Sequence, residues 1–293
     1  MTGTGRVPGT GPGSGASHGG TLWLVATPIG NLGDLAPRAI EVLASAALVC
    51  CEDTRRTGRL LQHAGIRAAR LAVANEHTEF HRIADVLHVL GSGGDVAVVT
   101  DAGTPGVSDP GERLVRAAID AGYTVAAVPG PVAAVTALII SGLPTDRWVF
   151  EGFLPRSGGE RARRLAEIAA EPRTIVLYEA PHRIIRTVAD LAVACGGDRP
   201  VAVCRELTKL YEEVVRGTLD EIGTAIGISE PRGEYVIVLA GAPVDDGPVD
   251  DDTIRVALDA ELAGGSTKKD AVAAVATRLA ISKKRVYTLA IGR

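Results

Sequence analysis

The segment 95–111, which reads Asp-Val-Ala-Val-Val-Thr-Asp-Ala-Gly-Thr-Pro-Gly-Val-Ser-Asp-Pro-Gly, constrains the fold of this chain more than any other stretch. Its short apolar run Val96–Val99 is mostly β-branched, which is typical of a strand buried on both faces of a sheet. Gly103 and Gly106 then permit backbone angles that other residues resist, so main-chain groups there can approach a ligand closely. The segment therefore predicts a buried strand followed by a ligand-facing loop.

A helix is expected directly after this loop. Asp109 can serve as its N-cap, Pro110 suits the first helical position, and Glu112 would complete a capping box. An apolar stripe follows at helical spacing, made up of Leu114, Val115, Ala118 and Ile119. In open α/β sheets ligands bind beyond the carboxyl ends of the strands, which is where this loop would lie.

The pattern of strand, loop and helix recurs along the chain and predicts an α/β protein with two lobes. Strands are expected at Leu22–Ala26, Leu48–Cys51, Arg70–Ala74, Val96–Val99, Tyr123–Val128, Trp148–Leu154, Thr174–Tyr178, Pro200–Cys204, Glu213–Thr218 and Tyr235–Leu239. The first half indicates a largely parallel sheet, and the second half indicates more antiparallel pairing. We expect a disordered leader at 1–20, an N-terminal α/β lobe at 21–134, a C-terminal α/β lobe at 135–242 and a helical basic tail at 249–293.

Composition narrows the class of protein. Of the 293 residues 46 % are hydrophobic, which is enough for one large domain or two of ordinary size. No apolar run approaches the roughly 18 residues of a membrane span, and the N-terminus lacks a secretory signal, so a cytoplasmic location is expected. The net charge of −4 provides no global positive field for nucleic acid, so any such surface must be local.

Motifs for several other chemistries are missing from the sequence. No G-x-G-x-x-G follows the first strand and no G-x-x-x-x-G-K-[ST] occurs, which argues against a dinucleotide site or a P-loop. The four cysteines form no C-x-x-C pair, so we interpret them as buried free thiols. His77 and His81 have metal-ligand spacing, but no third ligand is placed to complete a site, so no metal is expected.

Three loops rich in glycine and proline end strands of the first lobe, at 27–34, 100–111 and 128–131. Together they resemble the three cofactor-contacting loops of the tetrapyrrole methylase family, which bind S-adenosylmethionine in a cleft between two α/β lobes. One branch of that family is similar in more detail, and its members methylate the ribose 2′-hydroxyl of a cytidine in the decoding region of small-subunit (16S) ribosomal RNA. The matching segments are Ala26-Thr-Pro-Ile-Gly-Asn-Leu-Gly-Asp34, Cys51-Glu-Asp-Thr-Arg-Arg56, Thr100 to Gly111, Val128-Pro-Gly-Pro131 and Tyr178-Glu-Ala-Pro-His-Arg183.

The resemblance implies which residues contact this cofactor, largely through main-chain atoms. They are Pro28, Ile29 and Gly30 in the first loop, Asp101, Gly103 and Thr104 in the second, Pro129, Gly130, Val132 and Ala133 in the third, and Tyr178 at a strand end of the second lobe. Glu234 and Tyr235, before the last strand, are weaker candidates.

Methylation of a ribose hydroxyl also predicts a general base. A sulfonium donor brings its own leaving group, so the protein must mainly align the methyl group with the hydroxyl. The hydroxyl is a very weak acid, so a base or an orienting polar group is expected. The candidates are Glu52, Asp53, Glu76 and His182, with His77, Glu179 and Glu206 behind them, and each can equally be a helix cap or an ion-pair partner.

Basic residues near the predicted loop ends can hold RNA phosphates or simply form a solvated charged face. They are Arg55, Arg56, Arg183, Arg205 and Lys209. From Ser266 onward the tail also carries seven basic residues and one acidic residue. The expected partner is therefore 16S rRNA in a small ribosomal subunit, and the resemblance implies a homodimer.

Two alternatives remain open at this point. A methyltransferase for a corrin or porphyrin ring would need a wide apolar cleft, whereas the basic tail favours RNA. A non-catalytic RNA-binding module would bind S-adenosylmethionine and ribosomal subunits without transferring the methyl group.

Overall fold

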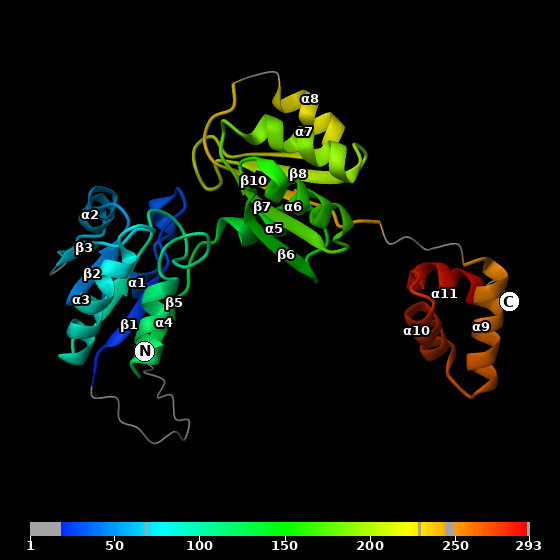
Figure 1. Ribbon diagram of the computed structural model, residues 1–293, viewed down its shortest axis with the longest axis horizontal. Helices are drawn as coiled ribbons and strands as arrows, with labels where there is room; N and C mark the ends of the chain where they lie inside the picture. Colours follow the sequence, from blue (N-terminus) through cyan, green and yellow to red (C-terminus); the bar gives the residue numbers. More distant parts are fainter. Residues whose placement is uncertain (1–18, 68–69, 228–229, 244–248, 292–293) are drawn as a thin grey trace, which may run out of the picture.

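A computed structural model describes residues 19–67, 70–227, 230–243 and 249–291 (Figure 1). The predicted leader falls almost entirely on residues 1–18, outside the described residues. The predicted two-lobed α/β class is confirmed, with one five-stranded sheet in each lobe and helices α9–α11 in a separate bundle. Among the described residues, none of the helices is long and apolar enough to cross a membrane.

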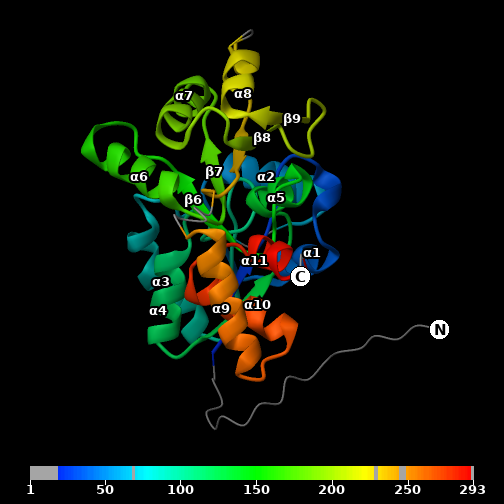
Figure 2. The same ribbon diagram turned by 90° about the vertical axis from the view of Figure 1, so that its right-hand side faces the viewer.

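The first sheet is entirely parallel and has the strand order β3-β2-β4-β1-β5. Its strands are β1 (Thr21–Val25), β2 (Leu48–Cys51), β3 (Leu71–Val73), β4 (Val96–Val98) and β5 (Thr124–Val128). Its helices are α1 (Pro37–Ser45), α2 (Thr54–His63), α3 (Glu79–Gly91) and α4 (Glu112–Asp120), and a 3-10 turn covers Leu32–Asp34. Helices α1 and α2 share a core with one face of the sheet, while α3 and α4 share a core with the other. Figure 2 shows α3 and α4 side by side.

This strand order brings the three glycine- and proline-rich loops together. Strand β1 pairs with both β4 and β5, so the loops after these three strands leave the same edge of the sheet as neighbours. The helix after β1 covers one face and the helix after β4 covers the other, which makes this edge a topological switch point. Open α/β sheets bind their ligands at such points.

The start of α4 differs from the sequence prediction. The helix begins at Glu112 with Gly111 as N-cap, and no side chain of its own segment caps it. Instead, Oε1 of the buried Glu79, at the start of α3, accepts hydrogen bonds from the backbone N–H of Gly111 (3.1 Å) and of Leu114 (3.0 Å). The predicted cap by Asp109 is therefore wrong, and its carboxylate is left free for another role.

The second sheet is mixed, with the order β6-β7-β10-β8-β9, and only β6 and β7 are parallel. Its strands are β6 (Trp148–Phe153), β7 (Thr174–Glu179), β8 (Pro200–Arg205), β9 (Glu213–Thr218) and β10 (Tyr235–Leu239). Helices α6 (Gly158–Ala170), α7 (Ile184–Cys195) and α8 (Leu219–Ile226) pack on one face. Helix α5 (Ala133–Ser141) packs on the other.

The position of α5 bears on where the lobes divide. Ala134, Ala137 and Leu138 share a core with Val176 and Val236 of the second sheet. We therefore propose that the lobes divide at 129–132, just before α5. Beyond the second lobe, α9 (Asp251–Ala263), α10 (Lys268–Arg278) and α11 (Lys283–Ile291) form a three-helix bundle around their own apolar core.

Replacing the external cap of α4 tests its contribution to stability. Glu79→Ala leaves two helix N–H groups without their acceptor, so we expect it to reduce the free energy of unfolding by about 1–3 kcal/mol. Urea denaturation measures this loss. Glu112→Ala, which removes an exposed acid from the first turn of the same helix, is the control and should change stability by less than about 0.5 kcal/mol. Equal losses in the two variants would contradict the assigned cap.

Candidate active site

The three loops at the switch point are joined to one another by hydrogen bonds. Thr27 and Gly103 form an antiparallel bridge, in which the Thr27 N–H donates to the Gly103 carbonyl (2.8 Å) and the Gly103 N–H donates to the Thr27 carbonyl (3.1 Å). The Thr104 hydroxyl donates to the carbonyl of Pro131 (3.2 Å). The loops therefore form one connected surface on which backbone is exposed to a ligand.

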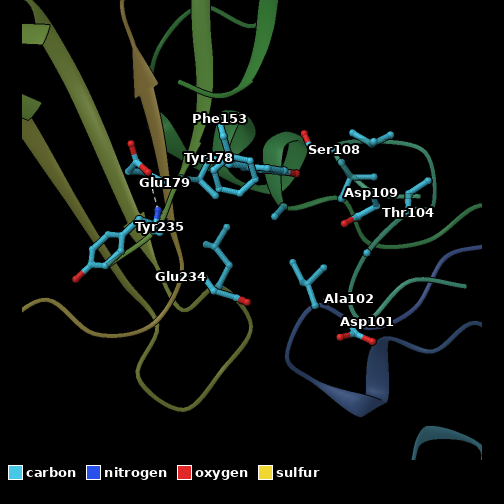
Figure 3. Close-up of a pocket in the computed structure, with 18 of the residues that line it drawn as sticks. Asp101, Ala102, Thr104, Ser108, Asp109, Phe153, Tyr178, Glu179, Glu234 and Tyr235 are labelled. Atoms are coloured by element: carbon cyan, nitrogen blue, oxygen red, sulfur yellow. Dashed lines mark hydrogen bonds between the residues drawn. The ribbon is translucent and has the colours of Figure 1, made fainter. Parts of the chain in front are cut away.

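A cavity of about 380 Å³ lies between this surface and the second lobe (Figure 3). The first lobe and its third loop contribute Ile29, Glu52, Arg56, Asp101–Thr104, Val107–Asp109, Val132 and Ala133. The second lobe contributes Phe153, Tyr178–Pro181, Leu207 and Glu234–Val236. This volume lies within the range of small-molecule and cofactor sites.

Carboxylates dominate the polar part of the cavity. Glu52 accepts a hydrogen bond from the backbone N–H of Asp101 (3.0 Å), and burial raises the pKa of Glu52. Oδ2 of Asp101 pairs with the Arg56 guanidinium (3.2 Å), but its buried Oδ1 has no hydrogen-bond partner among the described residues. Because buried polar atoms are nearly always paired, Asp101 Oδ1 marks a position where a ligand donor would be stabilised.

Asp109 is the most perturbed of these carboxylates. It follows Ser108, whose φ of 61° is unusual for a non-glycine residue, on the loop that Gly103, Gly106 and Gly111 also shape with positive φ angles. Burial raises the pKa of Asp109 to about 7, and the carboxylates of Glu52, Asp101 and Glu234 add to the effect. A carboxylate with this pKa exchanges its proton near neutral pH, as a general base must.

The second lobe supplies an aromatic wall. The hydroxyl of Tyr178 accepts a hydrogen bond from the backbone N–H of Ala134 (3.1 Å), which fixes its ring against the start of α5. Phe150 and Phe153 contact the ring of Tyr178 edge-on, at centroid distances of 5.0 and 5.7 Å. Phe153 is 52 % exposed at the rim of the cavity, where a planar ligand group can stack on it.

The predicted cofactor residues divide into two groups. Ile29, Asp101, Gly103, Thr104, Val132, Ala133 and Tyr178 line the cavity, whereas Pro28, Gly30, Pro129 and Gly130 do not. Pro28 lines a separate hollow of about 250 Å³. A side chain at Gly30 would meet Lys209 and Thr208 of the second lobe, and one at Gly130 would lie 2.8 Å from the Cβ of Ala26. The structure explains these two glycines by close packing of the loops.

The predicted general bases are also spread apart. Glu52 lines the cavity, and so does Glu179, which is buried and accepts hydrogen bonds from the Thr187 hydroxyl and its neighbour's N–H. Asp53 caps α2, where its hydrogen bonds with Arg55 hold the pKa of Asp53 down at about 2. Glu76 and His77 are exposed and lie outside the cavity, His182 lines a different hollow, and Glu206 pairs with Lys209.

All five predicted RNA-binding side chains already have acidic partners. Arg55 pairs with Asp53, and Arg56 with Asp101 at the cavity. The remaining pairs are Arg183 with Glu179, Arg205 with Glu213, and Lys209 with both Glu206 and Glu234. Of the five, Arg55 and Arg56 are exposed, whereas the other three side chains are mostly buried.

Sequence reasoning missed three polar or aromatic residues of this cavity, Ser108, Asp109 and Phe153. Asp109 was assigned to a helix cap, and Ser108 and Phe153 were assigned no role. The signal for Asp109 was its place in the same loop as Asp101 and Thr104, which was outweighed by the strong local cap pattern. Among the described residues, no group of three or more His, Cys, Asp or Glu side chains could hold a metal ion, and all four cysteines are free thiols.

Comparison with known proteins defines the class. The family described as Tetrapyrrole (Corrin/Porphyrin) Methylases matches residues 21–223. A similar solved structure is uroporphyrin-III C-methyl transferase from Thermus thermophilus complexed with S-adenyl homocysteine (22 % identity, 76 % of this chain, 97 % of that chain, TM-score 0.54). A second is the cobalt precorrin-4 methyltransferase (18 % identity, 80 % and 98 % coverage, TM-score 0.57). The chain therefore belongs to the tetrapyrrole methylase family, as the resemblance predicted.

More similar relatives define the branch of the family. A protein from Synechocystis sp. is 43 % identical over 273 residues, covering 93 % of this chain and 98 % of its own length. A protein from Mycobacterium tuberculosis is 48 % identical over 226 residues, covering 76 % and 78 %. Both carry the name ribosomal RNA small subunit methyltransferase I, and this chain groups with them in the family.

The raised pKa of Asp109 predicts a pH-dependent cost to stability. In the unfolded chain Asp109 ionises near pH 4, but in the folded protein it keeps its proton up to a pH of about 7. The contribution of Asp109 to wild-type stability should therefore fall as the pH rises through this window, because deprotonation of Asp109 costs more in the folded state. Asp109→Asn removes the titration, so its stability relative to wild type should increase between about pH 4 and 7 and then level off.

Thermal or urea unfolding across this pH range measures the difference between the two proteins. Asp120→Asn, an exposed change at the end of α4, is the control and should run parallel to wild type. A difference between Asp109→Asn and wild type that stays constant with pH would contradict the raised pKa.

Proposed function

We propose that this protein is an S-adenosylmethionine-dependent methyltransferase that methylates the ribose 2′-hydroxyl of a cytidine in the decoding region of small-subunit (16S) ribosomal RNA. The observation that carries this proposal is the cavity in which three connected strand-end loops face the second lobe. The names of the relatives from Synechocystis and Mycobacterium tuberculosis support the RNA substrate.

The residues of the cavity suit this cofactor. Its sulfonium and amino groups are cationic, and Glu52, Asp101, Asp109, Glu179 and Glu234 line the cavity with carboxylates. Asp101 Oδ1, which has no partner among the described residues, can accept a hydrogen bond from a ribose hydroxyl or an ammonium group. Apolar side chains from Ile29, Val132 and Leu207 can cover the uncharged parts of the molecule.

Asp109 is our candidate for the general base. When bound, S-adenosylmethionine supplies a methyl group on a sulfonium, which leaves as neutral S-adenosylhomocysteine. The Asp109 carboxylate would take the proton of the ribose hydroxyl as the oxygen attacks the methyl carbon, so no external proton acceptor is needed. Its pKa of about 7 allows it both to accept this proton and to release it to solvent afterwards.

The same proposal includes a homodimer, which rests on the family resemblance, and a cytoplasmic location, which the sequence composition led us to expect. Light scattering of the purified protein at micromolar concentration tests the dimer, and a monomer would contradict it.

Cofactor binding can be tested at Gly103, which lines the cavity with a φ of 87°. A side chain strains this backbone, so Gly103→Ala should shift the loop and weaken S-adenosylmethionine binding by at least about tenfold, measured by calorimetry. Gly93→Ala is a matched control, since Gly93 has a φ of 85°, open space around it and a position outside the cavity. Equal affinity in the two variants would contradict a cofactor site at Gly103.

The general base can be tested with Asp109→Asn, which keeps the size of the side chain. We expect the methylation rate to fall by about 10²- to 10⁴-fold at saturating S-adenosylmethionine. In the wild type, kcat/KM should rise with pH through about 7 because only the ionised carboxylate accepts a proton, and the variant should lack this rise. Asp120→Asn is again the control, and an unchanged pH profile in Asp109→Asn would assign the base elsewhere.

The proposed activity can be tested on small ribosomal subunits from cells that lack the gene for this protein. Mass spectrometry of their RNA after incubation with protein and labelled cofactor should locate one new ribose methyl group on a cytidine. Transfer to a corrin or porphyrin ring instead would support the tetrapyrrole alternative. Binding of cofactor and subunits without transfer to either acceptor would support the non-catalytic alternative.

A further inference from the structure

We propose that a second, cationic hollow beside the cavity binds a backbone phosphate of the RNA substrate, next to the nucleotide that is methylated. This inference rests on the proposed function, because it assumes that the acceptor is RNA. The cationic hollow has a volume of about 370 Å³. It is lined by Arg156, Arg161, His182, Arg183, Arg186 and Thr187.

Two of these arginines form the rigid frame of the hollow. Arg161 is only 4 % exposed and donates hydrogen bonds to Asp190 (2.8 Å), to the Pro155 carbonyl (2.9 Å) and to the Thr187 hydroxyl (3.0 Å). Arg183 pairs with Glu179 (3.2 Å) and donates to the Leu154 carbonyl (2.6 Å). These bonds tie the β6–α6 connection to the β7–α7 connection and fix the walls of the hollow.

The other basic residues remain available to a ligand. Arg156 is exposed and makes no ion pair or hydrogen bond with another described residue, and His182 is exposed as well. The Arg186 side chain is 63 % exposed, with its Nε 3.7 Å from Asp190. Four guanidinium groups thus face two carboxylates, Asp190 and Glu179, so the hollow keeps a net positive charge.

The hollow adjoins the cavity along both connections. Pro181 lines the cavity and the next residue, His182, lines the hollow. Phe153, the last residue of β6, lines the cavity, and Arg156, three residues further along, lines the hollow. A chain whose ribose enters the cavity beside Phe153 can therefore place a neighbouring phosphate in the hollow.

The opposite charges of the cavity and the hollow explain why the cofactor and the RNA phosphate would bind at separate sites. The cavity is lined by carboxylates, which favour a cationic cofactor and repel a polyanion. The phosphates of an RNA substrate must therefore bind outside that cavity. Arginine suits this role because its guanidinium group is cationic and can donate two parallel hydrogen bonds to phosphate oxygens. The hollow also lies at the start of α7, whose N-terminal N–H groups have no side-chain cap and add positive potential.

The test reverses the two exposed charges in the full-length protein. The double variant Arg156→Glu and Arg186→Glu leaves the framework residues Arg161 and Arg183 intact. We expect its KM for small subunits to rise at least tenfold, with kcat and the calorimetric Kd for S-adenosylmethionine unchanged. The plot of log affinity against log salt should also become shallower, by about one unit of slope for each phosphate that the variant no longer binds.

Arg163→Glu is the matched control, because Arg163 is 70 % exposed on α6 and lies outside the hollow. A double variant that binds subunits no more weakly than Arg163→Glu would overturn the inference, and so would calorimetry showing that inorganic phosphate alone saturates the site at micromolar concentration. If wild-type protein methylates no RNA, the proposed function itself fails. If wild type is active and the double variant equals it, only this inference fails.

Discussion

Parallel pairing of β1 with β4 on one side and β5 on the other is the constraint on which the candidate site depends. It places three loops that are far apart in the sequence at one edge of one sheet. The bridge between Thr27 and Gly103 and the bond from Thr104 to Pro131 then lock these loops together. Because backbone groups take part in all of these bonds, the surface depends on glycine and proline at a few positions more than on particular side chains.

Placing the cap of α4 on another element has a chemical effect on this surface. When a carboxylate of the preceding loop caps a helix, it accepts hydrogen bonds from the first N–H groups and is not available to a ligand. Here Glu79 of α3 supplies the acceptor, so Asp109 can face the cavity instead. The buried Glu79 thereby connects the packing of α3 against α4 to the chemistry of the site.

Local sequence was enough to predict the strands and the loops, but not their distant partners. The ten expected strands lie within about a residue of the observed ones, because short β-branched runs bounded by glycine and polar residues have few other ways to fold. The cap of α4 could not be predicted, since Glu79 is 32 residues from Gly111. The sequence placed Gly30 in a ligand-binding loop. In the structure a glycine is needed there because the loop packs closely against Thr208 and Lys209. Arg56 and Lys209 look available in sequence, yet their partners Asp101 and Glu234 are far away along the chain and are brought close only by the fold.

The lobe boundary that we propose at 129–132 bears on how the protein would respond to ligands. One wall of the cavity belongs to each lobe, and Ala134 at the start of α5 is held by Tyr178 of β7. A rotation about this boundary would change the width of the cavity and leave each sheet intact, but it would break the contacts of Gly30 and Asn31 with Thr208. A molecule that contacts both walls favours the lobe orientation it fits best. The first ligand to bind would in this way change the affinity for the second, and the coupling is the same whichever of the two binds first.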